Sequence, residues 1–281
     1  MRRTLLIMPF LAVAAQPAGF GEPHVTYLAF SPDGKSLTAT YYRHAINRPG
    51  TDWGSFGVTW DIATGRAMTL QNAIGSVAYS PDGKLLATGL VERSREPGFR
   101  NRPYVRLALW TPGEAKPATV LTAPTDPGPT AAGQRASDKG SVVAFAFHPG
   151  GKHVAVASVD QLWWHTLGGN AVPLADLKLA PMPWRNTAAL VIEDDAKVLR
   201  LTTPPVSGRG KATVVRWRVE VAEKGATYTE MSREEKDVPP WEREVTAVSP
   251  DGAMKASATG VGVTVVDAKT GQKLKEFRPG K

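Results

Sequence analysis

The feature that most constrains this fold is one short stretch, Val77–Gly89, with the sequence VAYSPDGKLLATG. Pro81 presets a backbone φ of roughly −65° at the first central position of a turn, and Asp82 can hydrogen-bond to its own backbone there. Gly83 has no Cβ and therefore accepts the positive φ that follows. Apolar and small residues flank the turn on both sides, so the stretch predicts a strand, a tight turn and a returning strand.

The same stretch recurs several times in the sequence. Clear copies are Leu28–Thr38, Phe145–Ala155 and Thr246–Lys255, and a worn copy is Leu190–Leu199. The copies are spaced by roughly 45 to 70 residues, which is typical of a repeat architecture. A third strand, often carrying tryptophan, follows each hairpin, and a short fourth strand comes next. Four strands per repeated unit predict an all-β fold, a β-propeller of four-stranded antiparallel blades.

Five units are visible, so we expect five blades. A sixth blade would have to lie within Thr122–Ser141 or Arg200–Glu244. We expect each fourth strand to form the outer strand of the next blade, which leaves Leu274–Phe277 spare. This C-terminal strand is therefore predicted to pair with Gly57–Ile62 and to close the ring, because free sheet edges invite aggregation.

The repeats resemble those of WD-repeat β-propeller proteins, in a bacterial, exported and degenerate form. The S-P-D-G-K turn, the return strand LATG and the run Trp60-Asp61-Ile62-Ala63-Thr64-Gly65 carry the resemblance, which extends from about Val25 to Phe277. The Gly-His pair of the family is missing, and only Trp60-Asp61 keeps the Trp-Asp pair. The resemblance implies a binding scaffold without catalysis, that is, a protein that is not an enzyme.

The ends of the sequence predict its domain organisation and its location. Arg2 and Arg3 precede the apolar run Leu5–Val13, and the small residues Ala12-Val13-Ala14 follow, as in a secretory signal peptide. We expect a signal peptide at 1–15, a lead-in at 16–24 and a single propeller domain at 25–281. The mature protein is predicted to be exported, periplasmic or secreted, with no stable membrane insertion after signal removal.

The cysteine and charge content limit the reactions and ligands that are open to this protein. The chain has no cysteine, so disulfides and thiol chemistry are impossible. The formal net charge is +8, and removing Arg2 and Arg3 leaves +6. A basic exported protein is attracted to anionic glycans or lipid head groups rather than to nucleic acid, although solubility alone is the interpretation favoured for this charge.

Long insertions predict where binding occurs. In an antiparallel blade the turns alternate between two faces, and every long loop falls on the face opposite the S-P-D-G turns, including 43–56, 91–104 and the charged stretch Thr229–Glu244. Variable loops on a rigid scaffold are common binding sites. Arginine with aromatic side chains suits carboxylate, sulfate or sugar recognition. The candidate residues for binding a protein or peptide partner are Arg43, His44, Arg48, Trp53, Arg93, Arg95, Phe99, Arg100, Arg102 and Tyr104.

Motifs for catalysis are not found in the sequence. The five histidines lack metal-ligand spacing, and no nucleophile elbow, phosphate loop or dinucleotide glycine pattern occurs. We therefore expect no cofactor and no metal. Trp60, Trp110, Trp164 and Trp217 recur at one strand position and are predicted to pack between blades. Two alternatives stay open: a propeller enzyme of the lactonase or quinoprotein sort, and a binder of anionic glycans through the arginine loops.

Overall fold

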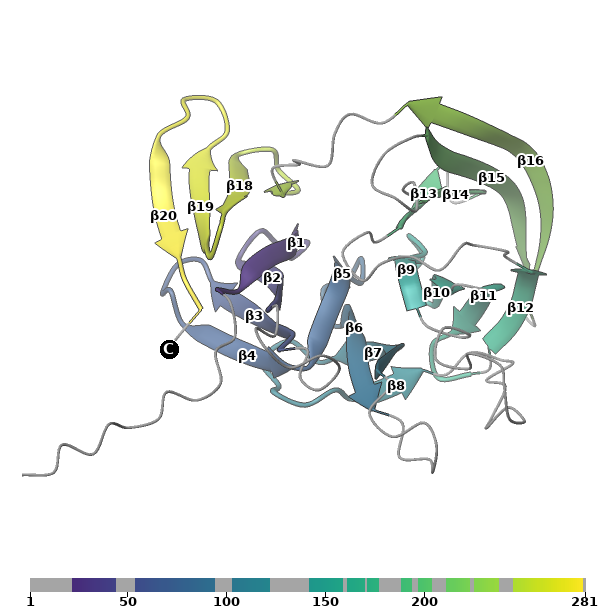
Figure 1. Ribbon diagram of the computed structural model, residues 1–281, viewed down its shortest axis with the longest axis horizontal. Coiled ribbons are helices and arrows are strands. Elements are labelled where there is room, and N and C mark those ends of the chain that lie inside the picture. Colours follow the sequence, from purple (N-terminus) through teal and green to yellow (C-terminus); the bar gives the residue numbers. More distant parts are fainter. Residues whose placement is uncertain are drawn as a thin grey trace, which may run out of the picture.

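The computed structural model describes residues 22–43, 54–93, 103–121, 142–158, 161–169, 171–176, 188–193, 197–203, 211–222, 225–237 and 245–279. All twenty secondary-structure elements in these ranges are β-strands, and they form five four-stranded antiparallel sheets. The strands of each sheet are consecutive in the sequence (Figure 1). The fold is therefore a β-propeller with five blades, as the sequence predicts.

The strands are as follows. Sheet I contains β1 (His24–Phe30), β2 (Ser36–Tyr42), β3 (Phe56–Asp61) and β4 (Ala67–Gln71). Sheet II contains β5 (Ala73–Tyr79), β6 (Leu86–Arg93), β7 (Pro103–Trp110) and β8 (Thr119–Leu121). Sheet III contains β9 (Val142–Phe147), β10 (His153–Ser158), β11 (Gln161–Thr166) and β12 (Ala171–Asp176). Sheet IV contains β13 (Ala189–Glu193), β14 (Val198–Thr203), β15 (Lys211–Ala222) and β16 (Gly225–Asp237). Sheet V contains β17 (Thr246–Val248), β18 (Met254–Thr259), β19 (Gly262–Asp267) and β20 (Lys273–Phe277).

The S-P-D-G turns form the hairpins that the sequence predicts. In sheet II the Ser80 hydroxyl donates to Asp82 Oδ1 at 2.7 Å and accepts the Leu85 N–H at 2.9 Å. Gly83 takes a φ of 70°, in the left-handed region that favours glycine. The corresponding turns of sheets I and V repeat the same hydrogen bonds. Local turn chemistry therefore sets these three hairpins.

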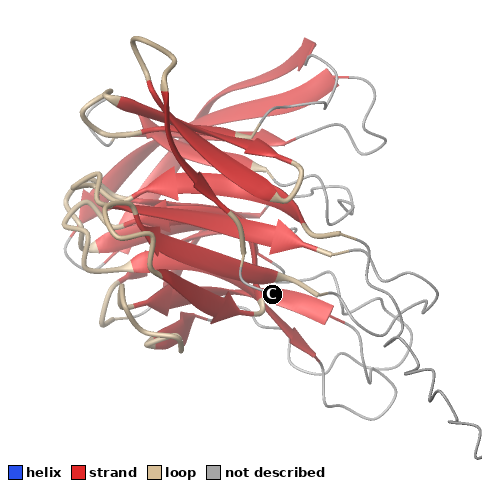
Figure 2. Ribbon diagram, turned by 90° about the vertical axis from the view of Figure 1, so that its left-hand side faces the viewer, coloured by secondary structure: helices blue, strands red, loops and turns tan. Residues whose placement is uncertain are grey.

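The turns of each sheet gather on one face of the molecule, called here the plain face, and Figure 2 shows most of the described turns at that end of the strands. Backbone hydrogen bonds tie the turn after the third strand to the first hairpin turn. Examples are Ile62 N to Lys35 O at 2.8 Å and Ala268 N to Ala253 O at 2.8 Å. The opposite end of the strands is called the loop face.

The sheets pack through apolar faces in the order V, I, II, III, IV. One buried cluster joins sheets V and I, and includes Trp60, Val265 and Phe277. Other clusters join I with II, II with III, and III with IV. The predicted packing tryptophans Trp60, Trp110, Trp164 and Trp217 are each 1% exposed, which confirms their role. The first strands of neighbouring sheets also pack together around the centre, in the order β17, β1, β5, β9, β13.

The predicted ring closure by a C-terminal strand is wrong. β20 pairs with β19 of its own sheet, with Val263 opposite Phe277, and β3 pairs with β2 and β4. β4 and β20 stay in their own blades because a tight turn precedes each of them. Asp61 accepts hydrogen bonds from the Thr64 N–H and hydroxyl at 2.7 and 2.8 Å, and Asp267 accepts the equivalent bonds from Thr270 at 2.7 and 2.9 Å. A short hairpin costs little loop-closure entropy, so pairing within the blade is favoured.

Among the described residues, the five blades form an arc in which sheets IV and V are not seen to close the ring. In the part of the protein that the structure describes, these two sheets share no hydrophobic cluster and no closely packed pair of strands. Figure 1 shows them standing apart, with sheet V at the upper left and sheet IV at the upper right. Sheet V is held against the rest of the arc through sheet I, where Phe277 stacks on Trp60 with ring centroids 5.3 Å apart.

Candidate functional site

The predicted binding residues fall mostly outside the described ranges. His44, Arg48, Trp53, Arg95, Phe99, Arg100 and Arg102 lie there, so their placement stays a prediction. Arg93 ends β6 and Tyr104 is the second residue of β7. The pairs Glu92 with Tyr104 and Arg93 with Pro103 bring both residues to the loop-face end of one hairpin. Arg43 follows β2 and lies at the same face of sheet I.

The hairpin of sheet II is stiffened near this end. β6 and β7 stay paired from Leu86 and Trp110 up to Arg93 and Pro103. On this hairpin Arg106 Nε lies 3.3 Å from Glu92 Oε2, and both side chains are about one-third exposed. An exposed pair of this kind contributes roughly 0.2–1 kcal/mol. The pairing of β6 with β7 therefore continues up to the loop-face ends of both strands.

Arg43 is the one predicted residue whose side-chain surroundings are described. Its guanidinium lies over the Phe56 ring, with Cζ 5.1 Å from the ring centroid. Its Nε is buried and has no hydrogen-bond partner among the residues that the structure describes. The Phe56 ring is in turn stacked with the Tyr41 ring of β2, with ring centroids 4.9 Å apart and an interplanar angle of 5°. The Tyr41 hydroxyl is also buried, with no hydrogen-bond partner in the described ranges, and burial raises its pKa.

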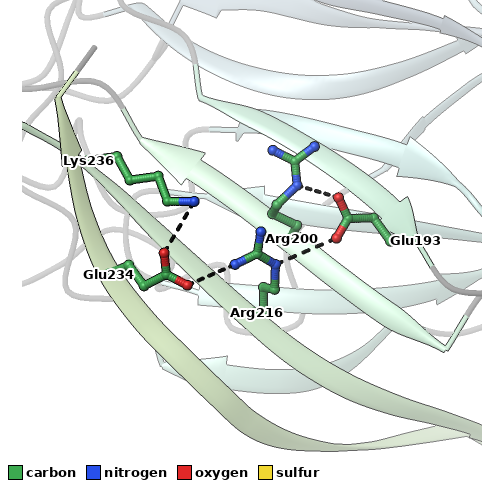
Figure 3. Close-up of polar contacts among 5 residues, drawn as sticks. All are labelled: Glu193, Arg200, Arg216, Glu234 and Lys236. Atoms are coloured by element: carbon green, nitrogen blue, oxygen red, sulfur yellow. Dashed lines mark hydrogen bonds and ion pairs between the residues drawn. The ribbon is translucent and has the colours of Figure 1, made fainter.

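A charged surface on sheet IV was not predicted. The stretch Thr229–Glu244 was expected to be a loop, but its first part belongs to β16, which pairs with β15 along its length. Alternating positions of the four strands place charged side chains on the face turned away from sheet III. They are Glu193, Arg200, Arg216, Glu234 and Lys236 (Figure 3).

These five side chains are linked to one another by ion pairs. Arg216 bridges the two carboxylates: its Nε lies 3.6 Å from Glu193 Oε2, and its Nη1 lies 3.0 Å from Glu234 Oε1. Lys236 and Arg216 lower the pKa of Glu234, with the Lys236 contact as the larger cause. The side chains remain 29–52% exposed. Mutual pairing at the water-exposed end of an array is what a terminal repeat requires for solubility, so this face serves as a polar cap.

Sheet III carries a cluster of aromatic and imidazole rings at the plain face. His148 stands where other turns have serine, and its Nδ1 accepts the Gly150 N–H at 3.0 Å. The His148 and His153 rings both lie against Trp164, at 5.6 and 5.4 Å. Burial lowers the pKa of both histidines. The imidazole acceptor thus replaces the Ser-Asp pair of the other turns.

The described residues contain neither a metal-binding cluster nor a helix that could span a membrane. Among them, no three His, Asp or Glu side chains gather as a metal ion would require. Within the same ranges, no helix has the length and apolar character needed to cross a membrane. The first strands contribute mostly apolar and small side chains, such as VVAFAF in β9.

Comparison with known proteins supports the resemblance to WD-repeat propellers. The family described as "WD domain, G-beta repeat" matches residues 66–94, which cover β4, β5 and β6. No curated protein matches this sequence.

Similar solved structures show low identity. A functionally unknown protein from Desulfotomaculum acetoxidans is 12% identical, with a TM-score of 0.44, over 91% of this chain and 70% of that one. The Myceliophteria thermophila Cps50 (Swd1) β-propeller domain is 14% identical, with a TM-score of 0.39, over 92% and 88%. Kluyveromyces lactis Hsv2 is 13% identical, with a TM-score of 0.36, over 92% and 64%.

Proposed function

We propose that this protein is a non-enzymatic propeller scaffold that binds a protein or peptide partner at its loop face. The observation that carries the proposal is the contrast between the two faces. On the plain face, the S-P-D-G turns satisfy their polar groups internally, as Ser80 and Asp82 do. On the loop face, Arg43 keeps a buried Nε that finds no acceptor in the part of the chain that the structure describes. WD-repeat propellers usually act as protein-interaction scaffolds, which agrees with this assignment.

Site-specific photo-crosslinking tests the proposal on one strand. A benzophenone amino acid is placed at Arg93, at the loop-face end of β6, or at Lys84, in the S-P-D-G turn before β6. Lys84 is a matched control because it is exposed and lies just before β6, at the end of this strand opposite to Arg93. We expect a discrete crosslinked product in cells from position 93 and none from position 84. Equal products from both positions, or from 84 alone, would contradict loop-face binding.

We also propose that the protein is exported. Support comes from Arg2, Arg3 and the apolar run Leu5–Val13 at the start of the sequence. Mass spectrometry of the N-terminus of protein from the native host tests this. A mature protein that begins close to residue 15 is expected, whereas a retained Met1 in a cytosolic fraction would count against export.

A further inference from the structure

Arg43 holds a positive charge with no counter-ion among the described residues. It forms no ion pair within those ranges, and its Nε is shielded from water without a hydrogen bond. The residue as a whole is only partly buried, so part of it stays accessible to a ligand. Burying a charged donor without an acceptor is costly, and native proteins rarely leave such a group unexplained.

The guanidinium is held in a fixed position. A Cβ built on Gly54 would lie 3.2 Å from Arg43 Cβ and 3.3 Å from its Cδ, so a glycine makes room for the arginine stem. The charged end rests on the Phe56 ring, which is itself stacked on Tyr41. An arginine fixed in this way loses little conformational entropy when it binds a ligand.

A second unused donor lies on the same strand face. Tyr41 and Arg43 are two residues apart along β2 and its extension, so their side chains leave the same side of the sheet. Tyr41 is 0% exposed, and its hydroxyl has no partner among the described residues. Two neighbouring positions therefore each supply a hydrogen-bond donor that has no partner among the described residues.

We propose that Arg43, supported by Tyr41, binds a carboxylate group of the protein partner. A carboxylate presents two oxygens in one plane, which match Nε–H and one Nη–H of arginine side by side. One guanidinium neutralises one carboxylate, and Nε is the half of this fork that now lacks an acceptor. The carboxylate can come from an aspartate or glutamate side group or from the C-terminus of a polypeptide. This inference rests on the proposed scaffold function and names the chemistry of its partner.

Nuclear magnetic resonance of the arginine side chains tests the site directly. The Nε–Hε signal of Arg43 is followed while sodium acetate is added, with sodium chloride at equal ionic strength as the reference. We expect a saturable shift with acetate alone. In Arg43→Lys, which keeps the charge but lacks the fork and this signal, the backbone amide of Tyr42 is followed instead and should show no saturable shift. Arg66, an exposed arginine near the plain face of the same sheet, is the matched control and should not shift saturably. A linear response, or an equal response to chloride, would overturn the proposal.

The Tyr41→Phe variant separates a binding role from a structural one. Because the hydroxyl has no partner in the free protein, its removal should raise the melting temperature while weakening acetate binding about threefold to tenfold. Ser55→Ala is the control: this hydroxyl is also buried and unpartnered, so its removal should leave acetate binding unchanged. A lower melting temperature with unchanged acetate binding in Tyr41→Phe would remove Tyr41 from the site.

Two peptides identify the source of the carboxylate. One is a glycine peptide blocked at both ends with a single glutamate, and the other is an all-glycine peptide with a free C-terminus. The peptide that shifts Arg43 at the lower concentration names the source, and binding of neither would overturn the proposal. If the protein with benzophenone at position 93 crosslinks as strongly with Arg43→Lys as with Arg43, the carboxylate contact alone is refuted. If it forms no crosslinks even with Arg43 present, the result counts against the scaffold function itself.

Discussion

Replacing Thr88 by valine tests how the packing tryptophans are held. Trp110 Nε1 donates to Thr88 Oγ1 at 2.9 Å, and the two residues are 1% and 0% exposed. Valine keeps the shape of threonine and removes the acceptor, so the indole N–H stays buried without a partner. Such a loss costs about 1–3 kcal/mol, and we expect about 2 kcal/mol here. The melting temperature should fall by about 4–8 °C.

Urea unfolding followed by circular dichroism measures this change in a double-mutant cycle. In the Trp110→Phe background the donor is gone, so Thr88→Val should cost nothing. The difference between the two costs is the coupling energy of the hydrogen bond. An equal cost in both backgrounds would refute the reasoning, because the effect would then come from packing rather than from the indole.

The reverse experiment belongs in sheet III. Trp164 Nε1 is buried and has no acceptor among the described residues. Ala157 stands in the same register relation to Trp164 as Thr88 does to Trp110. Ala157→Ser should supply the missing acceptor and stabilise the protein by about 1 kcal/mol. Destabilisation by this variant would show that the two blades are not equivalent at this position.

Three further predictions follow. Gly89→Ala places a Cβ 2.5 Å from the Ile74 carbonyl oxygen, so chemical unfolding should show a loss of about 1–3 kcal/mol or more, and a neutral result would contradict this steric account. Burial lowers the pKa of His148 below its usual 6.5, so the contribution of neutral His148 to stability should be fully present above pH 6.5 and fall as the pH drops below it. The double variant His148→Ser, Gly150→Asp should weaken this pH dependence in melting curves, and an unchanged pH profile would argue against it. Burial raises the pKa of Tyr79 to about 12, so stability should fall as the pH rises above 10, and Tyr79→Phe should lose less stability over that window.

The sequence by itself determined the local units. The S-P-D-G turns, the strands on either side of them and the number of blades all depend on residues close together in the sequence. The burial of Trp60 and its equivalents could be predicted for the same reason, because one pattern repeats at one strand position. Turn chemistry and apolar patterning act over short separations, so they can be interpreted before the fold is known.

The candidate site was only partly predictable. Arg43 was identified from its position in a long loop next to aromatic residues. Its lack of an acceptor, its contact with Phe56 and the part played by Tyr41 depend on how two strands pair. The charged face of sheet IV was missed because the charge density of Thr229–Glu244 suggested a loop, whereas alternation along β16 puts Glu234 and Lys236 beside Arg216.

Only the tertiary structure decided how the blades are arranged. A fourth strand can pair with its own blade or with the next one, and both pairings satisfy the same apolar pattern. The tight turns at Asp61–Gly65 and Asp267–Gly271 favour the nearer partner, so β4 pairs with β3 and β20 pairs with β19. Closure depends on contacts between sheets that are far apart in the sequence. No local pattern specifies those contacts, because their free energy depends on which faces meet in space.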